Sequence, residues 1–233
     1  MAGFLGRRVN PMTHVVIDIE TLGYPFDSFD KTQQEYLLKF AGTEEERADA
    51  ILKLSLYPMT AQIIAIALLN PETDRGKVLF QSKPPINTQS PDGTIQFISG
   101  TEDEILQHFW EDIPKYSQFI TFNGRGFDCP FIMLRSAIRR IKPTRNLMPY
   151  RYDSSVHCDL LDQFTFYGAS RKFSLDFVCK SFGIESPKSH GVTGLDLGRL
   201  SAEGKHMEIA EYCLGDVKAT AELFRRWDEY LKF

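Results

Sequence analysis

Short apolar runs rich in β-branched residues alternate along this chain with longer stretches in which apolar residues recur at helical spacing. The short runs, bounded by turn residues, predict strands, which we place at 14–19, 62–69, 78–81, 118–122 and 157–160. The longer stretches predict helices, which we place at 101–110, 128–140, 161–166, 174–182 and 206–230. Two segments rich in Pro, Ser, Asn and Gly predict loops, at 83–100 and 183–198.

Three strands come first, and the later strands alternate with helices. This order predicts an α/β fold in which a mixed sheet of five or six strands carries helices on both faces. Residues 24–58 interrupt the order, because they are polar and helix-prone, and they predict a helical insertion between the first two strands. No linker divides the chain, so we expect residues 1–233 to form a single domain.

A net charge of −4 argues against a protein that coats nucleic acid through its overall charge, but it does not exclude local contact with one strand end. One basic stretch contains no acid between Cys129 and Tyr152. Its basic residues are Arg135, Arg139, Arg140, Lys142, Arg145 and Arg151. They form either a surface that follows phosphates beside a site or a solvated helix face and loop.

The cysteines and the apolar runs bear on the expected cellular location of the protein. Cys129, Cys158, Cys179 and Cys213 are scattered without a CxxC pair, so we expect reduced, mostly buried thiols in a cytoplasmic protein. The longest wholly apolar run, 63–69, is too short to span a bilayer, and we expect no contact with a membrane.

Five residues carry the candidate chemistry. Asp18 and Glu20 follow the first apolar run, and Asp128 lies between the fourth run and a helical pattern, whose N-cap it is expected to form. Tyr212 and Asp216 are four residues apart on the last helix and therefore share a face. Carboxylates gathered at one point raise each other's pKa values unless cations neutralise them, and oxygen ligands suit Mg²⁺ or Mn²⁺. The spacing predicts a metal-dependent phosphoryl-transfer enzyme.

These residues resemble the three motifs of the DEDD superfamily of 3′→5′ exonucleases, which share a ribonuclease H-like fold. The first motif matches Asp18-Ile19-Glu20, and the second matches the segment from Asn123 to Asp128. The third motif exists in a tyrosine and a histidine version.

The tyrosine version of the third motif fits the segment from Tyr212 to Asp216, because Glu211 stands where the histidine version requires His. The segments NGRGFDCPFI and YCLGDVKATAELF resemble the proofreading exonuclease domain of family B DNA polymerases, in a form without an attached polymerase.

The resemblance implies hydrolysis with two divalent cations, Mg²⁺ or Mn²⁺, and release of nucleoside 5′-monophosphates from single-stranded DNA. Asp18 is then expected to bridge both cations, while Glu20 and Asp216 complete the ligands of the one that binds the attacking water. Asp128 is expected to hold the second cation through water, and Tyr212 to orient the attacking water. A phenol with a pKa near 10 suits positioning better than general-base action.

Substrate contacts also follow from the resemblance. Thr21 and Leu22 are expected to touch the terminal nucleotide, with Leu22 as a wedge beside the last base. Asn123 is expected to donate or accept a hydrogen bond near the scissile end, and Phe127 to stack on a base or sugar. Core packing is the alternative for Leu22 and Phe127. Lys188 lies in a loop that either closes over substrate or is simply solvated.

Two alternatives to a DNA exonuclease stay open at this point. The first keeps the same residues but cuts RNA, as ribonuclease D-like enzymes do. The second is a catalytically silent domain that binds nucleic acid or another protein. A replication or repair protein is the partner that the resemblance implies.

Overall fold

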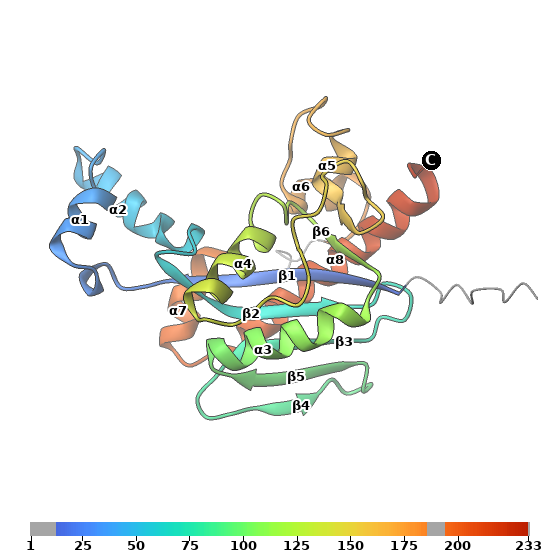
Figure 1. The fold of residues 1–233 in the computed structure, drawn as a ribbon, viewed down its shortest axis with the longest axis horizontal. Coiled ribbons are helices and arrows are strands. Elements are labelled where there is room, and N and C mark those ends of the chain that lie inside the picture. The colour runs from blue at the N-terminus through green and yellow to red at the C-terminus, as the bar shows by residue number, and fades with distance from the viewer. Residues whose placement is uncertain (1–12, 186–193, 233) are drawn as a thin grey trace, which may run out of the picture.

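The computed structural model describes residues 13–185 and 194–232 and centres on a seven-stranded sheet in the order β4-β5-β3-β2-β1-β6-β7 (Figure 1). The strands are β1 His14–Gly23, β2 Ala61–Leu69, β3 Gly76–Gln81, β4 Asn87–Gln89, β5 Ile95–Gly100, β6 Gln118–Thr121 and β7 His157–Asp159. β1 pairs antiparallel with β2 and parallel with β6, so the sheet is mixed, as predicted.

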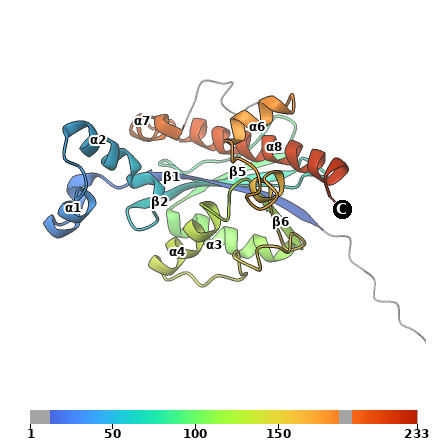
Figure 2. The ribbon, with the colours of Figure 1, turned by 90° about the horizontal axis from the view of Figure 1, so that it is seen from above.

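Helices cover both faces of this sheet, which confirms the predicted α/β class (Figure 2). They are α3 Glu102–Asp112, α4 Asp128–Ile138, α5 Leu160–Phe164, α6 Leu175–Ser181, α7 Leu197–Ala202 and α8 His206–Tyr230. Two short 3₁₀ segments, Ile113–Lys115 and Gly194–Asp196, lie between them. α3 and α4 lie on one face, whereas α6, α7 and α8 lie on the other.

Side chains along β1 point alternately to the two faces of the sheet. Val15, Ile17 and Ile19 join the core beneath α3 and α4. Val16 joins the core beneath α8, and Asp18 and Glu20 continue its row on the same face. β1 therefore places two acids at the packing surface of α8, the longest helix.

The predicted loop at 83–100 is wrong, because two strands lie within it, and they raise the total from the expected five or six to seven. β4 is fully exposed at the sheet edge, so no apolar pattern marks it. β5 carries the buried pair Ile95 and Phe97 at a spacing of two, which is a strand signal that the surrounding turn residues obscure.

Two predicted helix starts have different outcomes. Thr101 caps α3 as expected, since its side chain accepts from the N–H of Glu104 and the Glu104 side chain accepts from Thr101. The prediction that Asp128 caps α4 is wrong, because the N-cap is Phe127 and has no side-chain cap. The Asp128 carboxylate instead reaches across to β1, where it accepts from the N–H of Ile19 at 3.1 Å.

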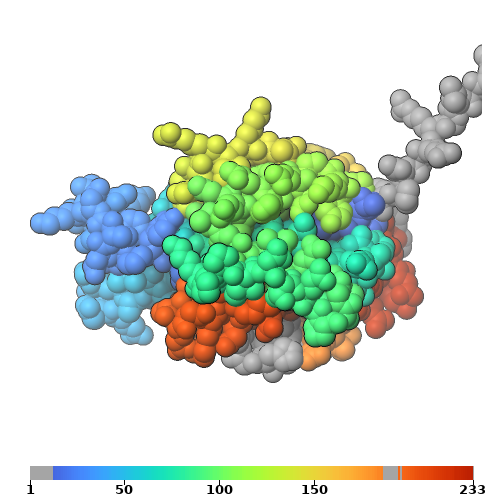
Figure 3. Space-filling view, turned by 90° about the horizontal axis from the view of Figure 1, so that it is seen from below, coloured from blue at the N-terminus to red at the C-terminus, as the bar shows by residue number. Residues whose placement is uncertain are grey.

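Between β1 and β2, residues 24–58 form an arm of short helices that projects from one end of the molecule (Figure 3). It contains α1 Lys31–Leu37, α2 Glu44–Leu52 and the 3₁₀ segments Phe26–Ser28 and Lys53–Leu56. Capping boxes at Asp30 and Thr43 begin the two α-helices.

Candidate active site

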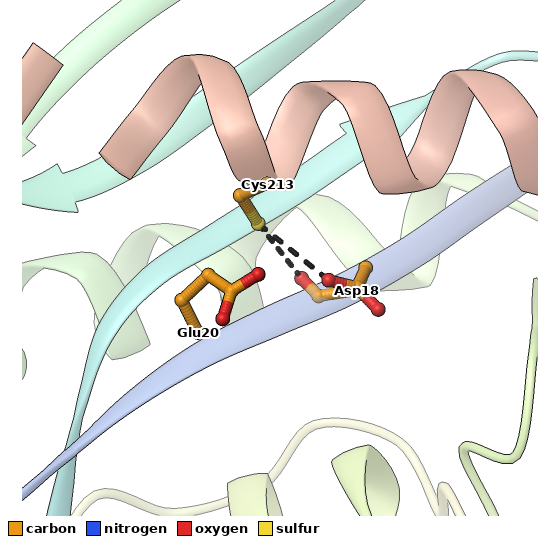
Figure 4. Close-up of side chains that lie close together, drawn as sticks. All are labelled: Asp18, Glu20 and Cys213. Carbon is orange, nitrogen blue, oxygen red and sulfur yellow. Dashed lines mark hydrogen bonds between the residues drawn. The ribbon is translucent and has the colours of Figure 1, made fainter. Parts of the chain in front are cut away.

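The side chain of Cys213 on α8 lies next to the side chains of Asp18 and Glu20 on β1 (Figure 4). One oxygen from each carboxylate and the Cys213 sulfur all lie within 4.8 Å of one another. The thiol donates to the carbonyl oxygen of Asp18 at 3.7 Å and to its Oδ2 at 3.8 Å. Two acids and a thiol from distant parts of the sequence therefore share one small space, in which Glu20 and Cys213 are buried and Asp18 is half-buried.

Asp128 reaches β1 from the opposite layer, at the point where β6 has ended. The pairing of β1 with β6 reaches only Val16 and Ile120, because β6 ends at Thr121. Beyond that point the N–H of Ile19 lacks a strand partner on this side, and Asp128 supplies the acceptor. The sequence places Asp128 far from β1, but the early end of β6 brings it to the first motif.

The four carboxylates perturb one another strongly. Burial, followed by repulsion from neighbouring carboxylates, raises the pKa of Asp18 and of Glu20 well above the usual range. Burial also raises the pKa of Asp128 to about 7, despite the lowering effect of its backbone hydrogen bonds. Asp216 is among the repelling neighbours of all three, and its carboxyl is also in hydrogen-bond contact with Glu20. The predicted acids therefore form one cluster.

Tyr212 lies half-buried beside this cluster on α8. Burial, and then the negative charges of Asp216, Glu20 and Asp18, raise the pKa of its phenol. The hydroxyl therefore keeps its proton at neutral pH and can donate or accept a hydrogen bond. This favours the positioning role over general-base action.

The turn between β6 and α4 is held by an acid that the sequence analysis did not select. The Asp159 carboxylate accepts from the N–H of Asn123 at 2.9 Å and from that of Arg125 at 2.9 Å. Asn123 itself has a φ of +64° and is exposed. A Cβ on Gly124 would lie 2.4 Å from the Cβ of Thr121, so only glycine fits there.

The candidate substrate contacts lie in different surroundings. The Thr21 hydroxyl donates to the carbonyl of Ser55 in the arm, so its side chain is engaged within the protein. Leu22 borders a cleft of about 370 Å³ between β2 and α8. Phe127 packs partly on the core beneath α4, with its ring 5.4 Å from that of Phe131.

Most of the basic stretch is engaged inside the protein. Arg135 is buried in a bidentate pair with Glu102, and Arg139 pairs with Asp103. Arg145 donates to the carbonyls of residues 113, 116 and 117, and Arg151 pairs with Asp162. These contacts favour a structural role for most of the stretch. Lys188 lies outside the described residues.

Cys213 is a site residue that the sequence analysis treated only as a buried thiol. Its position three residues before Asp216 places it on the same helix face as that acid, which is the signal that could have found it. All four cysteines are buried and unbonded, as expected. In the described part of the chain, no helix is long and apolar enough to cross a membrane.

The seven-stranded mixed sheet with helices on both faces is the ribonuclease H-like exonuclease fold, in agreement with the predicted class. Comparison with known proteins then places the chain more narrowly. A family described as a "predicted 3′-5′ exonuclease related to the exonuclease domain of PolB" matches residues 59–231, and the chain belongs to this family. The predicted resemblance to family B proofreading domains is therefore confirmed.

Two similar proteins carry polymerase names. DNA polymerase 1 of Sulfolobus acidocaldarius is 27% identical over 179 residues, which cover 69% of this chain and 19% of that protein. The chain thus spans about a fifth of the length of this relative. The family B DNA polymerase of Pyrobaculum calidifontis shares the fold, with a TM-score of 0.60 and 15% identity over 94% of this chain and 25% of that one.

Proposed function

We propose that this chain is a metal-dependent 3′→5′ exonuclease that releases nucleoside 5′-monophosphates from single-stranded DNA. The observation that carries the proposal is the convergence of three elements on one partly buried acidic cluster. β1 supplies Asp18 and Glu20, α4 supplies Asp128, and α8 supplies Tyr212 and Asp216. Carboxylates that repel one another and raise one another's pKa values suit a site that holds cations.

The donor set fits two divalent cations, Mg²⁺ or Mn²⁺, which when bound supply water activation and charge stabilisation at the leaving oxygen. Asp18 is the acid best placed to serve both, because Glu20, Asp128 and Asp216 all act on it. Glu20 and Asp216 would serve the attacking side, and Asp128 the leaving side. The neutral Tyr212 hydroxyl would orient the attacking water.

DNA is the favoured substrate because both similar proteins are named DNA polymerases. The same carboxylates suit RNA, whose 2′-hydroxyl would need a separate contact. A replication or repair protein as a partner stays a prediction. A catalytically silent binding domain is the alternative without chemistry.

The test is hydrolysis of 5′-labelled single-stranded DNA and RNA of matched sequence, with Mg²⁺, Mn²⁺ or EDTA. Wild type is compared with Asp18→Asn, which keeps the shape of the side chain but removes its charge. Glu45→Gln is the matched control, because this exposed carboxylate lies on the arm. We expect a ladder that shortens from the 3′ end, and that is absent with EDTA and in Asp18→Asn.

The outcomes separate the alternatives. Faster cutting of RNA would replace DNA as the substrate and keep the mechanism. No cutting of either strand, although both bind, would support the silent domain. Loss of activity in Glu45→Gln as large as in Asp18→Asn would contradict the assignment of the cluster.

A further inference from the structure

Six aromatic rings between residues 150 and 182 are exposed, although large aromatic side chains are usually buried in a folded domain. Their exposed fractions run from 38% to 73%. We call them the aromatic belt: Tyr150, Tyr152, Phe166, Phe173, Phe177 and Phe182. Exposed apolar patches of this kind mark surfaces that bind a partner.

The rings of the aromatic belt are ordered by contacts with their neighbours. Phe173 and Phe177 stack with centroids 4.5 Å apart and an interplanar angle of 12°. Tyr152 lies 5.6 Å from Tyr150 and 4.8 Å from the half-buried Tyr167. Between α5 and α6 the four phenylalanines of the belt line an apolar cleft of about 330 Å³. The belt therefore offers flat faces and an open slot.

The surface around the aromatic belt carries exposed cations. Four basic side chains of segment 150–182 are exposed: Arg151 and Lys180, which pair with Asp162 and Asp176, and Arg171 and Lys172. Of the acids in this segment only Asp153 is exposed, and the others are buried or half-buried: Asp159, Asp162 and Asp176. Arg171 also lies over the Phe173 ring at 5.1 Å. Flat rings interleaved with exposed cations are the combination that grips single-stranded nucleic acid.

Segments that carry the aromatic belt contact elements that carry the candidate active site. The Arg125 guanidinium, in the turn before Asp128, donates to the carbonyls of Pro149 and Tyr150. α5 and α6 both pack on α8, the helix that carries Tyr212 and Asp216 (Figures 1 and 2). A nucleic-acid strand whose 3′ end lies at the carboxylates can therefore continue past the turn that contains Arg125 and reach the aromatic belt.

We propose that the aromatic belt binds the nucleotides on the 5′ side of the scissile end by stacking their bases on its rings. The inference rests on the proposed function, because it assumes that the 3′ end lies at the carboxylate cluster. The exposed cations Arg171 and Lys172 favour a polyanion over an apolar protein segment. A protein that docks on the belt is an outcome of the test.

Binding is measured first, without hydrolysis, as the fluorescence anisotropy of 5′-fluorescein-(dT)₁₅ in EDTA. Tyr152→Ala and Phe177→Ala are each expected to weaken binding about tenfold. Tyr152→Phe keeps the ring and should keep binding, whereas Tyr152→Leu keeps only apolar area and should not. Phe40→Ala is the matched control, because Phe40 is equally aromatic and 89% exposed but lies on the arm. Thermal unfolding checks that each variant folds.

The salt dependence of binding and the dependence of hydrolysis on substrate length give two independent tests of the aromatic belt. Arg171→Gln and Lys172→Gln should each reduce the slope of log affinity against log salt by about 0.7. In hydrolysis, the loss of kcat/KM caused by Phe177→Ala should be large on a 15-nucleotide strand and small on a dinucleotide. Unchanged (dT)₁₅ binding in the Tyr152→Ala, Phe177→Ala double variant would overturn the inference and favour a protein-docking surface.

The two proposals fail in different ways. If wild type cuts DNA but the belt variants bind (dT)₁₅ normally, only the inference about the belt is wrong. If wild type binds (dT)₁₅ through the belt but cuts neither DNA nor RNA, the exonuclease proposal is wrong and the belt is a binding surface. Glu45→Gln, on the arm, should bind (dT)₁₅ as wild type does.

Discussion

The strongest stability prediction concerns Asp128→Asn in metal-free protein. The buried Asp128 carboxyl has a pKa of about 7, against an ordinary value of 3.8. Its ionisation at pH 8 therefore costs about 4 kcal/mol of folding free energy, at about 1.4 kcal/mol per pKa unit. Asparagine removes this cost and keeps an oxygen for the N–H of Ile19.

The weaker hydrogen bond to a neutral amide offsets about 1 to 2 kcal/mol of this gain. We therefore expect a net gain of about 2 to 3 kcal/mol at pH 8, or a rise in Tm of roughly 5 to 10 °C. The sign depends on pH. Because the folded pKa is raised, the contribution of Asp128 to stability is fully present below pH 3.8 and is lost as pH rises through about 7. The advantage of the Asp128→Asn variant over wild type should shrink toward zero at pH 5.

The assay is thermal unfolding in EDTA at pH 5 and pH 8. Asp128→Ala is the matched variant, because it removes the charge and also the acceptor for Ile19, and it should be less stable than Asp128→Asn. Saturating Mn²⁺, at about 100 times its Kd, should stabilise wild type by about 2.7 kcal/mol and the Asp128→Asn variant by less. A Tm for Asp128→Asn that equals wild type at pH 8, or a gain independent of pH, would refute the reasoning.

Three further substitutions test individual contacts in the structure. Tyr212→Phe should lower kcat on single-stranded DNA about 100-fold with little change in KM, in steady-state kinetics, because only the hydroxyl that orients water is lost. Gly124→Ala should cost about 1 to 3 kcal/mol in urea unfolding, since the new Cβ would lie 2.4 Å from that of Thr121. Glu102→Ala should cost about 3 to 5 kcal/mol by the same measurement, because it leaves the Arg135 guanidinium buried without its partner. Losses below about 0.5 kcal/mol would contradict either stability prediction.

Local signals made the main elements predictable. The apolar run of β1, the hairpin to β3 and the helical spacing of α8 are each encoded within a few residues, and the predicted bounds of α8 match the structure. β4 escaped prediction because it is an exposed edge strand of three residues that only β5 holds in place. Its pairing is a property of the sheet rather than of its own sequence.

The candidate site was also predictable only in part. The motifs indicated which acids matter, but not how Asp128 reaches them, because this depends on where β6 ends relative to β1. Asp159 was missed for a similar reason, since its role in holding the turn at Asn123 joins residues 36 positions apart. Contacts that depend on register between strands leave no periodic trace in the sequence.

The arm is attached to the body in a way that makes it exchangeable. The N–H of Tyr24 donates to the carbonyl of Thr60 at 2.8 Å, which continues the β1–β2 ladder past Gly23, so the chain leaves and returns at neighbouring points. No residue from Gly23 to Lys53 is buried, and helices as short as α1 and α2 are marginal on their own. This hairpin is therefore a natural grafting point, where one appendage can replace another while the sheet stays in register.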